Sequence, residues 1–294
     1  MTKIKGIYAA SLSILKKDLS LDVASTIKHA ENIIDLGCHG VVFFGSTGQS
    51  QLISLSEKIQ LINNLPASKY KTKYIIGTGL NSLADNINLM KISKSMGFHK
   101  FLIMPPAYYK YDDEGAYLFY AKIIEKIKDC KIILYNFEKL SGYKFSAEMV
   151  TKLVKDFPEN IIGCKDSSYN LFESLKLPNF LMFPGSEAKL LKGLELGCSG
   201  CISAVTNVTH SLARKVFDDF ENKVSQSKNE KLINVRETFD QFNLISALHS
   251  FLSTKNEKFK NILPPLVLLS KEKQKELTDK LNKLEFVTKK NLAA

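Results

Sequence analysis

The sequence predicts an α/β fold, and within that class a single (β/α)8 TIM barrel with additional C-terminal helices. Short β-branched or aromatic runs alternate with amphipathic stretches of helix length, and this alternation occurs eight times. Alternating strands and helices favour a parallel sheet. Eight repeats of near-equal length fit closure into a barrel better than an open sheet. We therefore expect a barrel over residues 1–225 and a helical extension over residues 226–294 that packs on it.

The eight short runs are predicted to be the strands of the barrel. They are rich in Ile, Val, Phe and Tyr, the residue types that suit a pleated, buried surface. In chain order they are Ile4–Ala10, Gly40–Phe44, Tyr74–Gly77, Lys100–Met104, Lys131–Asn136, Ile161–Lys165, Phe180–Phe183 and Gly200–Ala204.

The stretches between these runs are predicted to be helices, because their apolar residues recur three or four positions apart. Leu55, Ile59 and Ile62 show this spacing after Ser54, which is a favourable N-cap. Other helices are predicted at Ala24–Ile34, after Ser82, at Glu114–Lys128, from Ser146, near Tyr169, at Ala188–Leu196 and at His210–Phe220. Glycines are expected to end three of them, at Gly37, Gly97 and Gly197.

The chain continues beyond the eighth repeat with patterns typical of further helices. We expect these at Val235–Leu248 and Glu272–Lys283, with a boundary at Leu263-Pro264-Pro265 between them. Helices added after a complete barrel pack either against it or against a neighbouring subunit, and the sequence leaves both arrangements open.

The composition argues against several classes of partner. The net charge is +11, from 41 Lys and Arg against 30 Asp and Glu, but the basic residues are spread along the chain. A nucleic-acid-binding protein would concentrate them on one face, so we interpret them as a solvated surface that also attracts anionic substrates. No apolar run is long enough to span a bilayer, and the N-terminus lacks a secretory pattern. We therefore expect a cytoplasmic protein that binds neither nucleic acid nor membrane.

The cysteines predict neither disulfides nor a metal site. There are five of them at irregular spacing, which favours reduced thiols in a chain without a signal sequence. Cys198-Ser199-Gly200-Cys201 has the C-x-x-C form, but no second pair of ligands follows at zinc-finger spacing. We interpret this pair as two small buried residues and expect no metal.

In a (β/α)8 barrel the active-site groups lie at the C-terminal ends of the strands. The predicted strand ends carry hydroxyl groups, glycines and one lysine, which should meet on one rim. These ends are Gly45–Gln49, Gly77–Gly79, Pro105–Tyr109, Tyr135-Asn136, Lys165–Ser168, Gly185–Glu187 and Ile202–Ala204.

Lys165 is the most informative of these residues, because it directly follows the apolar run Ile161–Cys164. Either the strand ends at Cys164 and the lysine points into solvent, or the lysine is buried for a reason. An apolar barrel mouth disfavours the ammonium form, and a neutral amine can attack a ketone. The resulting iminium draws electrons from the neighbouring carbon, which permits a C–C bond to break or form.

Such chemistry also needs a group that moves protons. Tyr135 lies near the end of the strand next to that of Lys165. It can act as acid and base if the hydroxyl groups of Ser46 and Tyr108 form a chain that carries its protons further. The alternative is that Tyr135 only caps the core. The Gly45–Gln49 loop also has two alternative interpretations. It is either a simple turn or a nest of backbone N–H groups that binds a carboxylate.

Five signatures in order resemble one known family. They are Gly45–Gln49, then Pro105–Tyr109 before Glu114-Gly115, then Ile133–Asn136, then Gly163–Asp166, and finally Gly185-Ser186 with Gly200–Ser203. From Ile4 to about His210 the chain resembles the dihydrodipicolinate synthase and N-acetylneuraminate lyase superfamily of class I pyruvate aldolases. This resemblance implies a (β/α)8 barrel, no cofactor beyond the lysine itself, and a homotetramer built as a dimer of dimers.

The resemblance also implies roles for four catalytic residues. Lys165 corresponds to the lysine that forms the Schiff base with pyruvate, and Tyr135 to the general acid and base. Ser46 stands where the family usually has Thr in the proton relay and keeps the hydroxyl. Tyr108 corresponds to the relay tyrosine that family members lend to a neighbouring subunit.

Five further residues correspond to positions that bind substrate in the family. Thr47, together with backbone N–H groups of Gly45 and Gly48, is implied to bind the pyruvate carboxylate. Gly185 and Ile202 are implied to place backbone carbonyls near the substrate.

Departures from the family pattern bear on the second substrate. Leu140 stands where dihydrodipicolinate synthases carry the Arg that binds the carboxylate of aspartate semialdehyde, and an apolar side chain cannot do this. Lys139 is adjacent but lacks the fork of a guanidinium. Lys165–Ser168 is most similar to members that cleave 2-keto-3-deoxy sugar acids, whereas Gln49 and Glu138 replace the usual Glu and Pro and leave the subtype open.

We therefore expect a lyase that joins or separates pyruvate and an aldehyde through a 2-oxo-3-deoxy acid. The alternatives are a dihydrodipicolinate synthase with an unusual carboxylate site, an N-acetylneuraminate lyase, and a non-catalytic barrel that binds a small acid. The non-catalytic alternative predicts loss of Lys165 or Tyr135, and both are present.

Overall fold

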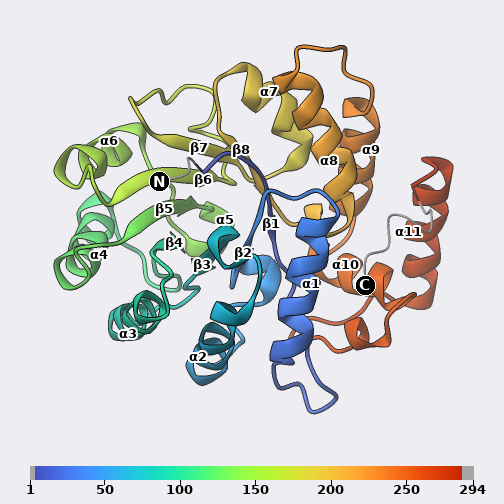
Figure 1. The fold of residues 1–294 in the computed structure, drawn as a ribbon, viewed down its shortest axis with the longest axis horizontal. Helices are drawn as coiled ribbons and strands as arrows, with labels where there is room; N and C mark the ends of the chain where they lie inside the picture. Colours follow the sequence, from blue (N-terminus) through green and yellow to red (C-terminus); the bar gives the residue numbers. More distant parts are fainter. Residues whose placement is uncertain (1–3, 287–294) are drawn as a thin grey trace.

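The computed structural model describes residues 4–286 and shows a ring of parallel strands surrounded by helices (Figure 1). The strands are β1 (Gly6–Ala10), β2 (Gly40–Phe43), β3 (Tyr74–Gly77), β4 (Lys100–Ile103), β5 (Lys131–Asn136), β6 (Ile161–Asp166), β7 (Leu181–Pro184) and β8 (Gly200–Ser203). They pair in the order β7-β6-β5-β4-β3-β2-β1-β8. Ser199 N, just before β8, donates to Met182 O of β7 at 2.8 Å and brings the two end strands together. The (β/α)8 barrel and its eight predicted strands are thus confirmed.

The barrel has an inner core and a second core between strands and helices. Successive side chains of a strand point to opposite faces. Val42, Ile75, Leu102 and Ile202 accordingly meet inside the ring, close to Tyr135. Their neighbours in sequence, such as Val41, Phe43 and Ile76, pack outward against the helices.

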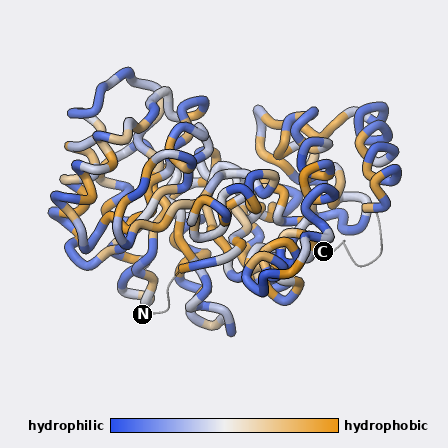
Figure 2. The backbone as a smooth tube through the Cα atoms, turned by 90° about the horizontal axis from the view of Figure 1, so that it is seen from above, coloured by the Kyte–Doolittle hydropathy of each residue, from blue (hydrophilic) through white to orange (hydrophobic). Residues whose placement is uncertain are grey.

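The outer helices follow the predicted order, with one exception. They are α1 (Val23–Asp35), α2 (Leu55–Asn64), α3 (Leu83–Ser95), α4 (Asp113–Lys126), α6 (Ala147–Asp156), α7 (Leu190–Glu195) and α8 (Thr206–Glu221). Ser54, Ser82 and Ser146 accept backbone N–H groups as N-caps, as predicted. In Figure 2 the outer helices alternate between hydrophilic and hydrophobic colours, as amphipathic helices do.

The prediction of a helix near Tyr169 is wrong. The segment between β6 and β7 forms turns and bends instead. The carboxylate of Asp166 accepts hydrogen bonds from the backbone N–H groups of Tyr169, Leu171 and Phe172, at 2.8–2.9 Å. A side chain has therefore taken donors that a helix would have used, which is how Asp competes with helical structure.

Three other boundaries differ from the prediction. The single helix expected at Val235–Leu248 is two helices, α9 (Asn229–Asp240) and α10 (Leu244–Ser253), because Asn243 caps the second one by accepting from Ser246 N. The helix expected from His210 begins four residues earlier, at Thr206. A short helix that was not predicted, α5 (Glu138–Ser141), follows β5.

The C-terminal helices α9, α10 and α11 (Lys271–Lys283) lie to one side of the barrel and share a third apolar core with it (Figure 1). Leu12 and Ile14, which follow β1, and Val205 and Val208, which follow β8, belong to this core. The extension is therefore anchored at the C-terminal ends of β1 and β8. No helix between residues 4 and 286 is both long and apolar enough to cross a membrane.

Three buried histidines should make the fold acid-sensitive. Burial lowers the pKa of each of His29, His210 and His249 from its ordinary value near 6.5 to about 4. Between these values the unfolded chain binds protons that the folded chain does not. The free energy of unfolding should therefore fall as the pH is lowered from about 6.5 to about 4, by at most about 3 kcal/mol per histidine.

Urea unfolding at pH 7, 6 and 5 measures this effect. We expect a steady loss of stability over this range, and a shallower slope for the variant His249→Gln. A free energy of unfolding that is flat between pH 7 and 5 would contradict the assignment of three neutral buried imidazoles.

Candidate active site

Lys165 and Tyr135 lie side by side at the C-terminal ends of β6 and β5, where the two residues are paired in register. Lys165 is only 3% exposed, so the alternative in which it points into solvent is wrong. Its Nζ atom lies 4.1 Å from the centre of the Tyr135 ring. Cys164, the preceding residue, is fully buried, and this burial raises the pKa of its thiol well above the usual range. The amine of Lys165 is therefore the accessible nucleophile at this point of the rim.

Tyr135 contacts the loop after β2 through its hydroxyl group. Its Oη lies 2.9 Å from Ser46 Oγ, and either hydroxyl can donate. Ser46 begins the 3-10 turn η1 (Ser46–Gly48), which is closed by hydrogen bonds from Gly48 N to Gly45 O and from Gln49 N to Ser46 O. The first link of the expected hydroxyl chain is thus present within one copy of the chain.

Two adjoining cavities meet at the Ser46–Tyr135 pair. The larger has a volume of about 570 Å³ and is lined by Ser46, Thr47, Tyr135, Phe137, Glu138, Lys139, Lys165, Ser167, Ser168, Tyr169, Gly185, Ala204, Arg236, Asp240 and Leu244. The smaller has a volume of about 160 Å³ and is lined by Phe44, Gly45, Ser46, Ser50, Gln51, Gly79, Leu102, Met104, Ala107, Tyr135 and Leu140.

The structure brings most of the predicted site residues to these two cavities. Thr47 and Gly185 line the larger one with Lys165, whereas Gly45 and Leu140 line the smaller one. Gly48 and Ile202 are buried and line neither cavity. The roles implied for these residues stay predictions.

Tyr108 is set apart from the other predicted residues. It is 90% exposed and lines neither cavity. Its φ of +86° is a left-handed conformation that an aromatic residue rarely adopts. Its ring contacts that of Tyr109, which is also exposed, at 5.3 Å. The backbone therefore presents Tyr108 on the outside of the chain and away from Ser46.

Asp166 fixes the loop that follows Lys165. Besides the three backbone N–H groups already described, its carboxylate accepts Asn136 Nδ2 at 2.8 Å, and the residue is fully buried. Ser167, Ser168 and Tyr169 in this loop line the larger cavity. Lys165 thus supplies the amine, and Asp166 holds the loop that forms the adjacent wall of the cavity.

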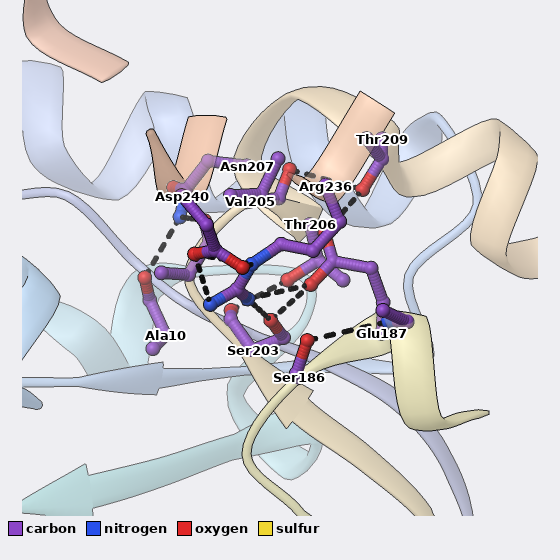
Figure 3. Close-up of polar contacts among 12 residues, drawn as sticks. Ala10, Ser186, Glu187, Ser203, Val205, Thr206, Asn207, Thr209, Arg236 and Asp240 are labelled. Atoms are coloured by element: carbon purple, nitrogen blue, oxygen red, sulfur yellow. Dashed lines mark hydrogen bonds and ion pairs between the residues drawn. The ribbon is translucent and has the colours of Figure 1, made fainter. Parts of the chain in front are cut away.

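Figure 3 shows a cluster of charged residues, two of which, Arg236 and Asp240, line the larger cavity. Arg236 of α9 donates through Nη1 to Glu187 Oε2 at 3.0 Å and to Ser203 Oγ at 2.8 Å, and through Nε to Asp240 at 3.0 Å. Glu187 is fully buried and also accepts Thr209 Oγ1 at 2.9 Å. One guanidinium therefore joins the ends of β7 and β8 to the C-terminal extension.

Arg236 and Asp240 were not predicted as site residues, because they lie in the extension and not at the predicted strand ends. One signal pointed to them. Arg236 is one of two arginines in a chain with 41 Lys and Arg in total, so an arginine marks a place where lysine does not suffice. Only a guanidinium offers several fixed donors to two carboxylates at once.

Comparison with known proteins identifies the family. The model of the dihydrodipicolinate synthetase family matches residues 3–284. The chain belongs to this family. Members act as carbon–carbon lyases of the class I aldolase type, and this enzyme class applies to the chain. An uncharacterized DapA-like lyase of Chloroflexus aurantiacus is 28% identical over 281 residues, which are 92% of this chain and 94% of that protein.

Solved structures of the dihydrodipicolinate synthetase family share the fold. Dihydrodipicolinate synthase from Agrobacterium tumefaciens matches with a TM-score of 0.86 and 24% identity, over 95% of this chain and 99% of that one. YagE, a prophage protein of E. coli solved in complex with pyruvate, matches with a TM-score of 0.85 and 20% identity, over 96% and 99%. These likenesses support the barrel together with its C-terminal helices.

The Arg236 cluster generates a stability prediction. Arg236→Met leaves the buried Glu187 carboxylate without its ion-pair partner, which should lower the free energy of unfolding by about 3–5 kcal/mol. The matched control is Arg214→Met, which removes the other arginine from a largely exposed pair with Asp218 and should cost about 1 kcal/mol or less. Urea unfolding of both variants measures the difference. Equal losses in the two variants would show that the buried cluster has no special role in stability.

Proposed function

We propose that this family member is a class I aldolase that cleaves or forms a 2-oxo-3-deoxy acid, with the pyruvate part bound as a Schiff base on Lys165. The observation that carries the proposal is the buried amine of Lys165, which lies against Tyr135 in a cavity. The hydrogen bond between Tyr135 and Ser46 adds a route for protons. A buried nucleophile, a proton carrier and a cavity are the parts that such a reaction requires.

The cleavage direction begins when Lys165 Nζ attacks the C2 carbonyl of the substrate. Water leaves and an iminium forms. As Tyr135 accepts the proton of the C4 hydroxyl group, it passes its own proton to Ser46, and Ser46 in turn releases its hydroxyl proton to the next member of the relay; the reverse movement later returns a proton for C3. The C3–C4 bond breaks, the aldehyde leaves, and the bonding electrons move to the iminium to give an enamine. Protonation at C3 and hydrolysis release pyruvate and return the lysine.

The substrate carboxylate is proposed to bind at the loop after β2. Thr47 lines the cavity beside Lys165, and η1 turns the backbone of this loop toward the same rim. Gly48 N and Gln49 N close the turn by donating to Gly45 O and Ser46 O, so the anion is proposed to bind at the N–H groups of Ser46 and Thr47, at the start of the turn. The likeness to YagE, whose structure was solved in complex with pyruvate, supports pyruvate as the ligand.

The Arg236–Asp240 side of the larger cavity favours a hydroxylated and uncharged aldehyde. The charge of Arg236 is already balanced by Glu187 and Asp240, so it offers no free cation to a carboxylate. The hydroxyl groups of Ser167 and Ser168 lie on the same cavity. Such groups hydrogen-bond to the hydroxyl groups of a sugar-derived aldehyde.

The lining of the smaller cavity disfavours a dihydrodipicolinate synthase, the activity for which several relatives are named. Leu140 occupies the expected Arg position, is 45% exposed and lines the smaller cavity. No specific observation favours N-acetylneuraminate lyase or a non-catalytic barrel over the proposed activity.

The exposed, strained Tyr108 fits an assembly in which it completes the proton relay of a second copy. We include a homotetramer, built as a dimer of dimers, in the proposal for this reason. Pyruvate and the aldehyde are then the only partners that the reaction itself requires.

Two substitutions test the roles of the catalytic pair. Lys165→Ala should abolish release of pyruvate from 2-oxo-3-deoxy sugar acids, because no other group can form the iminium. Tyr135→Phe keeps the shape of the site but removes the proton carrier, so kcat should fall by about 10²–10⁴-fold. Pyruvate release can be followed with a coupled dehydrogenase assay, with circular dichroism as the control for folding. Retained turnover in folded Lys165→Ala would exclude the proposed mechanism.

A third substitution tests substrate choice. Leu140→Arg places a bidentate cation where the synthases have one, so it should raise kcat/KM for condensation of pyruvate with aspartate semialdehyde by about tenfold or more. The native enzyme should prefer uncharged polyhydroxy aldehydes in the same assay. A native preference for aspartate semialdehyde would instead place the chain among the synthases.

A further inference from the structure

Gln49 joins the proposed carboxylate-binding loop to the C-terminal extension. It directly follows η1, and its own backbone is left-handed, with a φ of +55°. Its side chain is buried and makes two hydrogen bonds to the extension. Leu263 N donates to Oε1 at 2.8 Å, and Nε2 lies 3.3 Å from His249 Nε2 of α10.

These contacts determine how the protons are placed. Because Leu263 N can only donate, Oε1 is the acceptor and Nε2 the donor of the Gln49 amide. His249 Nδ1 lies 2.9 Å from Phe259 O, a carbonyl that can only accept. Nδ1 therefore carries the hydrogen, and the lone pair of Nε2 accepts from Gln49. Each polar atom is satisfied only with a neutral amide at position 49 and a neutral imidazole at position 249.

We propose that Gln49 is a positioning residue for pyruvate binding, which holds η1 in place by pairing with neutral His249 and with Leu263 N. The inference rests on the proposed binding of pyruvate at this loop. A strained backbone is maintained where surrounding contacts over-determine it. Here the contacts come from Ser13, whose Oγ donates to Gly48 O at 2.7 Å, and from the extension. The extension and the barrel therefore set the geometry of Ser46 and Thr47 together.

The variant Gln49→Glu tests this inference, because it keeps the size of the side chain but turns the donor into a carboxylate. The carboxylate then faces the lone pair of His249 Nε2, and the contact recovers only when a proton is added. His29 is the neighbouring titratable group, because its ring and that of His249 both contact the ring of Phe259. Burial lowers the pKa of His29 to about 4, so it stays neutral near pH 6 and pH 8. Pyruvate binding in the variant should therefore improve as the pH falls.

The measurement is the pyruvate concentration that gives half-maximal trapping by cyanoborohydride, relative to the native protein at the same pH. We expect an increase of about tenfold near pH 8 and a clearly smaller one near pH 6, while the maximal trapping rate changes little. Gln49→Glu combined with His249→Gln should lose the pH dependence, because an amide can donate to the carboxylate at any pH. Gln60→Glu adds the same charge at an exposed position of α2 and should have no effect.

The quantity compared is the half-maximal pyruvate concentration of a variant divided by that of the native protein at the same pH. Two results would overturn the inference. In the first, this ratio is the same for Gln49→Glu as for Gln60→Glu; in the second, the ratio for Gln49→Glu is the same at both pH values. If Gln49→Glu does not fold, Gln49→Met is the second variant, because it removes both side-chain hydrogen bonds without burying a charge. A half-maximal pyruvate concentration of Gln49→Met equal to that of the native protein would count against the inference. Failure of the native protein to trap pyruvate would instead refute the proposed function, so the two failures are distinguishable.

Discussion

The site is organised around the contact between the Lys165 amine and the Tyr135 ring. An amine can be kept inside a barrel mouth only if its surroundings exclude water and still offer polar contacts nearby. The parallel register of β5 and β6 supplies this geometry, since it sets the two residues level at the ends of their strands. Around them the rim carries Ser46 on one side and the Asp166-anchored loop on the other. The chemistry that we propose follows from these neighbours more than from any single residue.

Much of this arrangement could be predicted from the sequence. The apolar runs predict all eight strands, because parallel strands covered on both faces are continuous hydrophobic segments. The convergence of Lys165, Tyr135 and Ser46 then follows from the rule that barrel strands end on one rim. The helix near Tyr169 could not be excluded, since its pattern gave no sign that the Asp166 carboxylate would take its backbone donors. The break between α9 and α10 was likewise hidden by a continuous apolar periodicity.

The part of the site that comes from the extension could not be predicted from the sequence. Arg236 and Asp240 reach the cavity from α9, and His249 and Leu263 reach the loop of Ser46 through Gln49. The two Gln49 contacts link residues 200 and 214 positions apart, and local periodicity carries no information about them. The replacement of the family's usual Glu by Gln49 becomes understandable only beside a neutral His249. The extension is therefore part of the active-site architecture.

The most direct test of the central claim is reduction with borohydride in the presence of pyruvate, followed by peptide mass spectrometry. The account predicts one adduct with the mass of reduced pyruvate, on the peptide that contains Lys165. An adduct on a different lysine, or none from a protein shown to be folded, would contradict the assignment of Lys165 as the Schiff-base residue.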